Sequence, residues 1–168
     1  MSQWSYYALS RTEVCRFLPK SYSRVLEIGC GEGEFGGNLN AFVELWGVEP
    51  NDISAKNAIN KNYKILIGTF DQVASKLPDF YFDLVVCNDV IEHMVNHEEF
   101  LVKIQGKMKQ DACMVGSVPN VRYLKNLYNL LIKKDWEYVG SGILDATHLR
   151  FFTQRSLSRS LLRSGFLI

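Results

Sequence analysis

Short apolar runs alternate along this chain with segments whose apolar residues recur at helical spacing. The runs are four to six residues long, and glycine or proline follows four of them. They predict β-strands over Arg24–Ile28, Leu45–Glu49, Lys64–Ile67, Phe82–Cys87 and Cys113–Val118. Because strands that alternate with helices form βαβ units, the pattern indicates a parallel sheet covered on both faces.

The helical spacing predicts six helices between and after these strands. They run over Ser10–Leu18, Phe35–Glu44, Asp52–Asn60, Glu98–Met108, Tyr123–Lys133 and Gln154–Ser164. Thr153 is the expected cap of the last helix, and residues 136–147 form a long loop. The expected fold is α/β, with a three-layer, doubly wound, mostly parallel sheet. Phe166–Ile168 begin a further β run too short to be useful, which indicates a sheet truncated at its C-terminal strands. An unpaired edge of this kind could pair with a second copy in a homodimer.

Composition places the chain among ordinary globular domains. It has 168 residues, a net charge of +1 and 47% hydrophobic residues, enough for one domain and one core. The near-neutral charge argues against nucleic acid or an anionic membrane as a partner of the whole surface. No apolar run approaches a bilayer span, and the first residues do not form a signal peptide, so a cytoplasmic location is expected. The four cysteines form no C-x-x-C pair and are expected to pack as small apolar groups.

The strongest chemical signal is the glycine-rich turn that follows the first strand. Gly31-x-Gly33-x-x-Gly36 superficially fits a dinucleotide fingerprint, with Glu49 as the ribose acid. A diphosphate-binding turn should instead place its first glycine at the strand end, which leaves Glu34 where the third glycine belongs. Carboxylates around this turn would repel phosphates and suit a cationic ligand better.

With its neighbours, this turn carries a family resemblance. Glu27-x-Gly29-x-Gly31-x-Gly33 resembles the nucleotide-binding signature of class I S-adenosylmethionine (SAM) dependent methyltransferases. Further similar stretches follow in the same order, namely Gly47–Pro50, Gly68–Asp71, Phe82–Val85, Asn88–His93, Ser117–Asn120 and Asp145–Thr153. The last two are similar to motifs of a bacterial subgroup with small-molecule, often sugar-related or quinone-like, substrates.

The resemblance implies SAM as cofactor, S-adenosylhomocysteine as product, and a set of contact residues. Glu49 would accept hydrogen bonds from the ribose hydroxyls, and Glu27 would either orient the glycine turn or reach the SAM ammonium through water. The other expected cofactor-binding residues are Gly29, Gly31, Pro50, Thr69, Phe70, Asn88, Asp89, Val90 and Arg11. Thr69 replaces an acid that many relatives carry, so Asp71 could hold the adenine amino group instead.

Three histidines are candidates for chemistry. His148, flanked by Asp145 and Arg150, could take a proton from an acceptor hydroxyl, or it could simply hold its loop in place. His93 is the second catalytic candidate, as a residue lining the methyl-transfer site. His93 and His97 are four residues apart, a spacing at which two zinc ligands share a helix face, but no glutamate follows His93 and no third ligand is evident. No metal is therefore expected.

These observations lead to one function and two alternatives. The chain is expected to be one SAM-dependent methyltransferase domain over residues 1–168. It would comprise a helical cap (1–22), a SAM-binding core (23–118) and a substrate-side region (119–168). Its acceptor would be a small molecule, methylated on oxygen or nitrogen. The alternatives are a non-catalytic module that binds SAM or its product, and a nicotinamide-dependent oxidoreductase. The basic residues of 122–134 indicate either an acidic or nucleic-acid partner or, more simply, a solvated helix face; no nucleic acid is expected.

Overall fold

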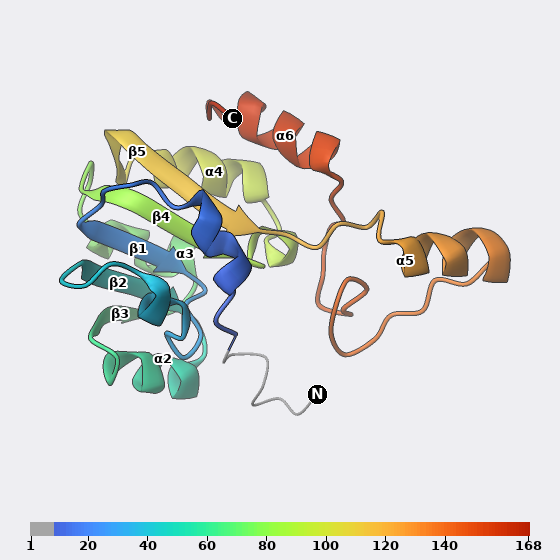
Figure 1. Ribbon diagram of the computed structural model, residues 1–168, viewed down its shortest axis with the longest axis horizontal. Coiled ribbons are helices and arrows are strands. Elements are labelled where there is room, and N and C mark those ends of the chain that lie inside the picture. The colour runs from blue at the N-terminus through green and yellow to red at the C-terminus, as the bar shows by residue number, and fades with distance from the viewer. Residues whose placement is uncertain (1–8) are drawn as a thin grey trace. The chain divides into compact units, whose positions relative to one another are not determined.

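The computed structural model describes residues 9–168 and contains one five-stranded parallel sheet in this part of the chain (Figure 1). The first eight residues of the predicted helical cap lie outside the described residues. The strands are β1 (Arg24–Ile28), β2 (Glu44–Glu49), β3 (Tyr63–Ile67), β4 (Phe82–Asn88) and β5 (Met108–Ser117). Their order is β3-β2-β1-β4-β5, and every neighbouring pair is parallel. The predicted α/β fold with a parallel, Rossmann-like sheet is confirmed.

The described chain forms two compact units. The first contains the residues up to Asn88 together with Lys103–Ser117, and it holds the whole sheet. The second contains Asp89–Val102 and Val118–Ile168. The predicted division into cap, core and substrate-side region stays a prediction.

The central strands of the first unit are buried on both faces. Val25 and Leu26 point to opposite sides of β1, and neither is exposed to solvent. This is why β1 and β4 appear in the sequence as nearly continuous apolar runs. On one face, the strand residues Val25, Leu84 and Val86 form a cluster with Val14 and Phe35. Glu27 is the buried ionisable residue of β1, whereas Arg24 at its start is partly exposed.

Short helices connect the strands of this unit. α2 (Asp52–Ile59) joins β2 to β3, and the side chain of Asn51 caps it by accepting hydrogen bonds from the backbone N–H groups of Ile53 and Ser54. α3 (Phe70–Val73) and the 3₁₀-helix η3 (Ala74–Lys76) lie between β3 and β4, where the sequence analysis placed no helix. The predicted helix over Ser10–Leu18 is a 3₁₀-helix, η1 (Thr12–Phe17).

The predicted helix over Phe35–Glu44 is wrong. Only η2 (Phe35–Asn38), a single 3₁₀ turn, forms there. Two glycines in that turn each disfavour a helix by about 1 kcal/mol relative to alanine. Leu39 and Val43 still pack against the apolar cluster, while Phe42 is fully exposed with a positive φ of 67°. The apolar spacing therefore reflected burial of an irregular segment.

The fourth predicted helix and the fifth strand have different bounds from those expected. α4 (His97–Gln105) ends earlier and buries Phe100, Leu101 and Ile104, the face that its pattern indicated. β5 begins already at Met108, although its burial pattern is irregular and a register shift separates its pairing with Phe82 from that with Leu84. Residues 166–168 do not form a strand.

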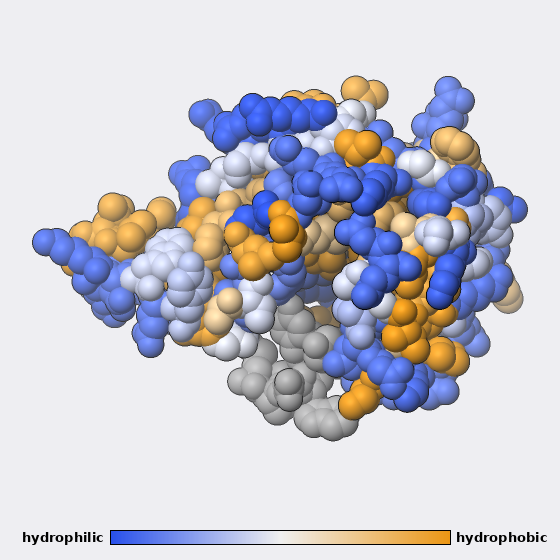
Figure 2. All heavy atoms as spheres, turned by 180° about the vertical axis from the view of Figure 1, so that it is seen from behind, coloured by the Kyte–Doolittle hydropathy of each residue, from blue (hydrophilic) through white to orange (hydrophobic). Residues whose placement is uncertain are grey.

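The second unit consists of short helices and long connections. It contains η4 (Ile91–His93), α5 (Leu124–Tyr128), η5 (Asn129–Lys133), which has π-helical hydrogen bonding, and α6 (Gln154–Arg163). Thr153 caps α6 as expected. Figure 2 shows that α5 and η5 expose apolar side chains beside hydrophilic ones, and Leu131 and Ile132 are about two-thirds exposed. Nothing in residues 9–168 forms a helix that is long and apolar enough to cross a bilayer.

Candidate functional site

The register of the sheet brings three strand ends to one edge. Ile28 of β1 pairs with Val48 of β2 and with Cys87 of β4. The next residues in the chain, Gly29, Glu49 and Asn88, therefore follow or end their strands at the same carboxyl edge. Ligands of open parallel sheets bind at this edge. The edge lies within the first unit.

The glycine turn after β1 depends on left-handed backbone. Gly29, Gly31 and Gly33 have φ angles of 67°, 52° and 75°, which residues with a side chain rarely adopt. A Cβ atom on Gly33 would lie 2.9 Å from the ring of Tyr63. Because no side chain projects from these positions, the backbone of the turn is open to close approach by a ligand.

Glu49 ties this turn to the end of β2. Its two carboxylate oxygens accept hydrogen bonds of 2.8 Å, one from the backbone N–H of Gly31 and one from that of Asn51. The side chain is only 3% exposed, and this burial raises the pKa of Glu49 while the two N–H donors counteract it. Each oxygen has a further lone pair, so the carboxylate can still accept two hydroxyl groups.

Glu27 lies in the middle of the sheet. The Tyr63 hydroxyl donates a hydrogen bond of 2.5 Å to its carboxyl group. Complete burial raises the pKa of Glu27 to about 8, even though the bond from Tyr63 lowers it and Glu49 raises it only slightly further. The group is therefore mostly protonated at neutral pH. Burial likewise raises the pKa of the neighbouring Cys30 thiol.

Asn88 ends β4 with a buried side-chain amide. Neither the nitrogen nor the oxygen of this amide has a hydrogen-bond partner among residues 9–168. Buried amides in folded proteins are almost always hydrogen-bonded, so such a group indicates a place for a ligand. Asp89, with a positive φ of 52°, and Val90 follow in the chain and belong to the second unit.

The remaining predicted cofactor residues are more scattered. Thr69 is exposed at the start of α3, and Phe70 is buried, with 4% exposed. Asp71, the alternative partner for adenine, forms an ion pair of 2.9 Å with Lys103. Pro50 is exposed. Arg11 lies 3.6 Å from Glu13.

Two residues that the sequence analysis did not single out complete the site. Asn51 both caps α2 and donates to Glu49, and Tyr63 holds Glu27. An asparagine directly before a predicted helix start is a recognisable signal. Tyr63 left no such signal, because its contact depends on the pairing of β3 with β2.

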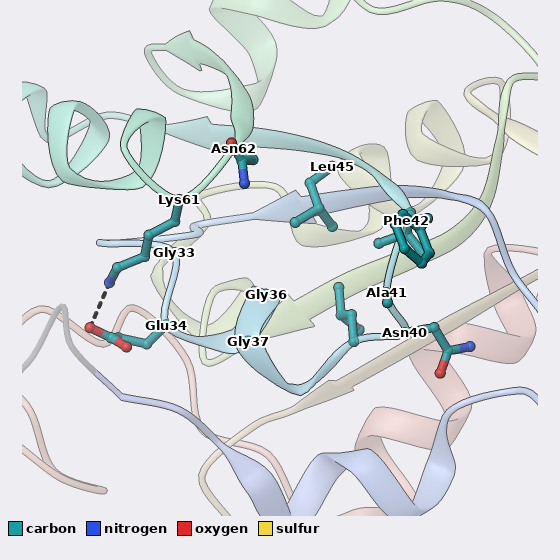
Figure 3. A pocket seen from close by; sticks show the side chains of 12 residues that line it. Gly33, Glu34, Gly36, Gly37, Asn40, Ala41, Phe42, Leu45, Lys61 and Asn62 are labelled. Atoms are coloured by element: carbon teal, nitrogen blue, oxygen red, sulfur yellow. Dashed lines mark hydrogen bonds and ion pairs between the residues drawn. The ribbon is translucent and has the colours of Figure 1, made fainter.

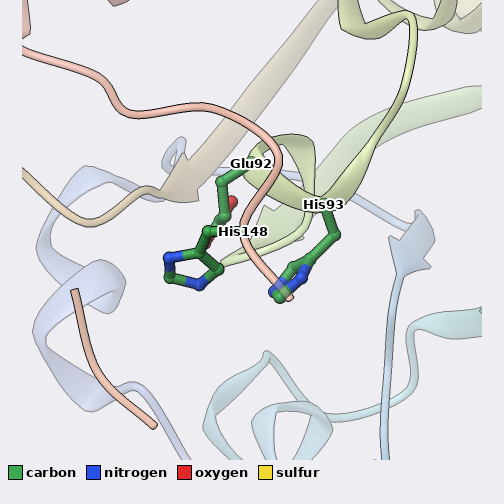
Figure 4. Close-up of side chains that lie close together, drawn as sticks. All are labelled: Glu92, His93 and His148. Atoms are coloured by element: carbon green, nitrogen blue, oxygen red, sulfur yellow. The ribbon is translucent and has the colours of Figure 1, made fainter. Parts of the chain in front are cut away.

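The second unit brings Glu92, His93 and His148 together. The three side chains point toward one another in Figure 4, and one ligand atom from each lies within 4.8 Å of the others. The two imidazole rings meet edge to face, with 4.7 Å between centroids. Burial, followed by the adjacent His148, lowers the pKa of His93.

Asp145, Arg150 and His97, which the sequence analysis placed near these histidines, have other hydrogen-bond partners as well. Asp145 binds the backbone N–H and hydroxyl of Thr147, and its backbone carbonyl accepts from the N–H of His148. His97 is not paired with His93, since its Nε2 lies 3.0 Å from the Ser160 hydroxyl. Arg150 donates to the carbonyls of Met94 and Val95.

A hollow of about 460 Å³ lies beside η2 and is lined in part by Gly33 of the glycine turn (Figure 3). It occupies the region of the predicted helix over Phe35–Glu44. Lys61 and Glu34, which form an ion pair of 2.6 Å, belong to its lining. Its lining includes glycine backbone and Leu39, Val43 and Leu45, and none of the expected cofactor residues.

Together, the sheet order and the strand-end groups define a Rossmann-like α/β protein with a candidate ligand site at the carboxyl edge of its sheet. The sequence matches the family described as "Methyltransferase domain" over residues 4–168. The chain therefore belongs to the SAM-dependent methyltransferase family, whose cofactor is SAM.

Individual relatives agree with this assignment. The chain is 30% identical to a ubiquinone biosynthesis O-methyltransferase of Rhodopseudomonas palustris, over 94% of this chain and 66% of the relative. It is 28% identical to the ubiquinone biosynthesis O-methyltransferase of Rickettsia prowazekii, over 74% of this chain and 50% of the relative. A solved SAM-dependent methyltransferase from Archaeoglobus fulgidus is 28% identical, with a TM-score of 0.74 over 96% of this chain and 69% of that one. The chain thus spans about half to two-thirds of the length of these curated relatives.

Proposed function

We propose that this chain binds SAM at the carboxyl edge of its sheet and transfers the methyl group to a small-molecule acceptor. The observation that carries the proposal is the Glu49 carboxylate, which is buried, joined to the glycine turn and still able to accept two hydroxyl groups. The SAM ribose offers two adjacent hydroxyls, so it matches this acceptor pair. The curated relatives are named as O-methyltransferases, which favours an acceptor oxygen.

In this proposal each strand-end residue contacts a different part of the cofactor. Gly29 and Gly31 let the backbone approach the ligand, Glu49 holds the ribose, and the Asn88 amide gains its missing hydrogen bonds from the bound cofactor. Thr69 and Phe70, at the end of β3, are assigned to the adenine side, and Pro50 follows Glu49. Glu27 acts on the turn from within the sheet, through Tyr63.

The chemistry asks for positioning more than for activation. The sulfonium of SAM is already a good methyl donor: the S–CH₃ bond breaks with its electron pair returning to sulfur, and a lone pair of the acceptor forms the new bond. Holding the two in line can supply roughly 7–11 kcal/mol of the barrier. The acceptor proton leaves to a base or to water. His93 and His148 stay predicted candidates for that base, and Arg11, Asp89 and Val90 stay predicted cofactor contacts.

The structure offers an argument against the dinucleotide alternative. A diphosphate-binding fingerprint needs an α-helix whose first turn faces the phosphates. Here the glycine turn leads into η2, a 3₁₀ turn of four residues, and then into an irregular segment.

Isothermal titration calorimetry with SAM and S-adenosylhomocysteine tests the proposal. Glu49→Gln should weaken both ligands roughly 10- to 100-fold, because one charge-assisted acceptor is replaced by an amide. Glu137→Gln, which removes an exposed carboxylate, should leave binding unchanged. Unchanged affinity in Glu49→Gln, or thermal protection by NADH but not by SAM, would contradict the assignment.

Incubation with labelled SAM and a pool of hydroxylated and amine metabolites tests turnover separately. Label in an acceptor supports methyl transfer. Tight SAM binding with no transferred label to any acceptor would instead support the non-catalytic binding module.

A further inference from the structure

The cluster of Glu92, His93 and His148 in the second unit has the composition of a metal site. Glu92 and His93 come from η4, and His148 comes from a loop far along the chain (Figure 4). Glu92 is 1% exposed and His148 is 8% exposed. A carboxylate and two imidazoles are donors that divalent transition metals prefer.

The Nδ1 atom of each imidazole lies within hydrogen-bond distance of a backbone carbonyl. The Nδ1 atom of His148 lies 3.0 Å from the carbonyl oxygen of Ile143. The Nδ1 atom of His93 lies 3.2 Å from the carbonyl oxygen of Thr147. The Thr147 hydroxyl also lies 3.2 Å from Nδ1 of His93, but it donates its proton to Asp145. Because a carbonyl can only accept, these contacts favour the tautomers with the proton on Nδ1, which leave the lone pair of each Nε2 for a metal ion. Metal-binding histidines are commonly held by such outer hydrogen bonds.

The backbone joins the two segments that supply the ligands. The carbonyl oxygen of Glu92 accepts from the N–H groups of Leu149 and Arg150, at 2.9 and 3.3 Å. Asp145 fixes the loop just before His148 by binding Thr147 at 2.8 and 2.6 Å. The fold of the second unit therefore brings the three ligand side chains together.

We propose that Glu92, His93 and His148 bind a divalent transition-metal ion, for which Zn²⁺ suits the donor set best. Two histidines and one glutamate are the protein ligands of many catalytic zinc sites, which leave a position for water or an oxygen of a small molecule. Ligand atoms around a tetrahedral zinc ion lie roughly 3.4 Å apart, whereas the three ligand atoms here lie up to 4.8 Å apart. Side-chain rotations that move these atoms by about 1 Å would close the difference. The expectation of no metal rested on the pair of His93 and His97, which lacked a following glutamate and an evident third ligand. In the structure His97 contacts Ser160, and Glu92 and His148 lie beside His93 instead.

Calorimetric titration of the chelator-treated protein with Zn²⁺, and separately with Mg²⁺, tests the site. One Zn²⁺ per chain should bind, and Mg²⁺ should bind at least tenfold more weakly. His148→Ala should weaken Zn²⁺ at least 100-fold, whereas His148→Cys, which keeps a zinc ligand, should retain most of the affinity. His97→Ala is the matched control, because this histidine lies outside the cluster, and it should bind Zn²⁺ like the parent.

Circular dichroism of each variant without metal first establishes that the second unit is folded. Binding of Co²⁺ gives an independent readout, because tetrahedral coordination by histidine produces visible absorption bands that the His148→Ala variant should lack. Absence of stoichiometric Zn²⁺ binding in the parent would overturn the inference, as would equal losses in His97→Ala and His148→Ala, or loss of Zn²⁺ in a folded His148→Cys.

The metal titration and the SAM titration can succeed or fail separately, although a metal ion bound by His93 and His148 would take away their predicted role as the base. Zn²⁺ is titrated in the absence of SAM, and SAM is titrated after chelation. Failure of the metal site with SAM binding intact removes only this inference, and the reverse result removes only the cofactor proposal.

Discussion

Glu27→Gln tests whether burial keeps the carboxyl group at the centre of the sheet protonated. The pKa of this group rises from its ordinary value of 4.5 to about 8, chiefly because the folded chain removes it from water. Between these two values the folded chain holds a proton that the unfolded chain has released. The free energy of unfolding of the parent therefore falls as pH rises through this window, by up to about 1.4 kcal/mol per pH unit from this group.

Glutamine cannot titrate, but its amide oxygen can still accept from the Tyr63 hydroxyl. Between about pH 5.5 and about pH 7.5 the parent should lose about 2–3 kcal/mol that the variant keeps. The other titrating groups are common to both proteins, so they cancel in the comparison to a first approximation. The quantity to follow is thus the stability of the variant minus that of the parent, and it should increase with pH.

Urea unfolding followed by circular dichroism at three pH values in this range measures the difference. Glu137→Gln, which removes an exposed carboxylate, controls for the loss of one charge. A Glu27→Gln minus parent difference that is constant with pH would refute the idea that burial holds the proton, whatever the size of that difference.

Two further substitutions probe the strand-end site. Asn88→Leu should raise the free energy of unfolding by about 1 kcal/mol, because it removes a buried amide with no partner among the described residues. The same change should weaken SAM binding roughly tenfold. Lower stability together with unchanged calorimetric affinity for SAM would contradict the proposed role of Asn88. Gly33→Ala should cost about 1–3 kcal/mol in urea unfolding, because its Cβ meets the Tyr63 ring in a left-handed backbone. Gly37→Ala, where a Cβ meets nothing within 4 Å, is the control, and equal losses in the two variants would rule out that contact as the cause.

The strands could be predicted because their cause is local in the sequence. A strand covered on both faces needs apolar residues at nearly every position, and glycine or proline commonly stops it, so β1 and β4 appear directly as nearly continuous apolar runs. The parallel order then brings Gly29, Glu49 and Asn88 to one edge, which made the candidate cofactor site accessible to sequence reasoning. The predicted helix over Phe35–Glu44 failed because apolar spacing records burial and does not record whether the backbone between the buried residues is helical.

Contacts between distant segments were beyond the reach of the sequence. The residue types and their local spacing were sufficient to establish an α/β chain with a glycine turn and an acid at the next strand end. The protonated state of Glu27 and its bond to Tyr63 required the packing of the sheet, because pKa values depend on burial and on neighbours that pairing supplies. The meeting of His148 with Glu92 and His93 required the loop to fold back onto η4, and no periodicity in the chain encodes that approach.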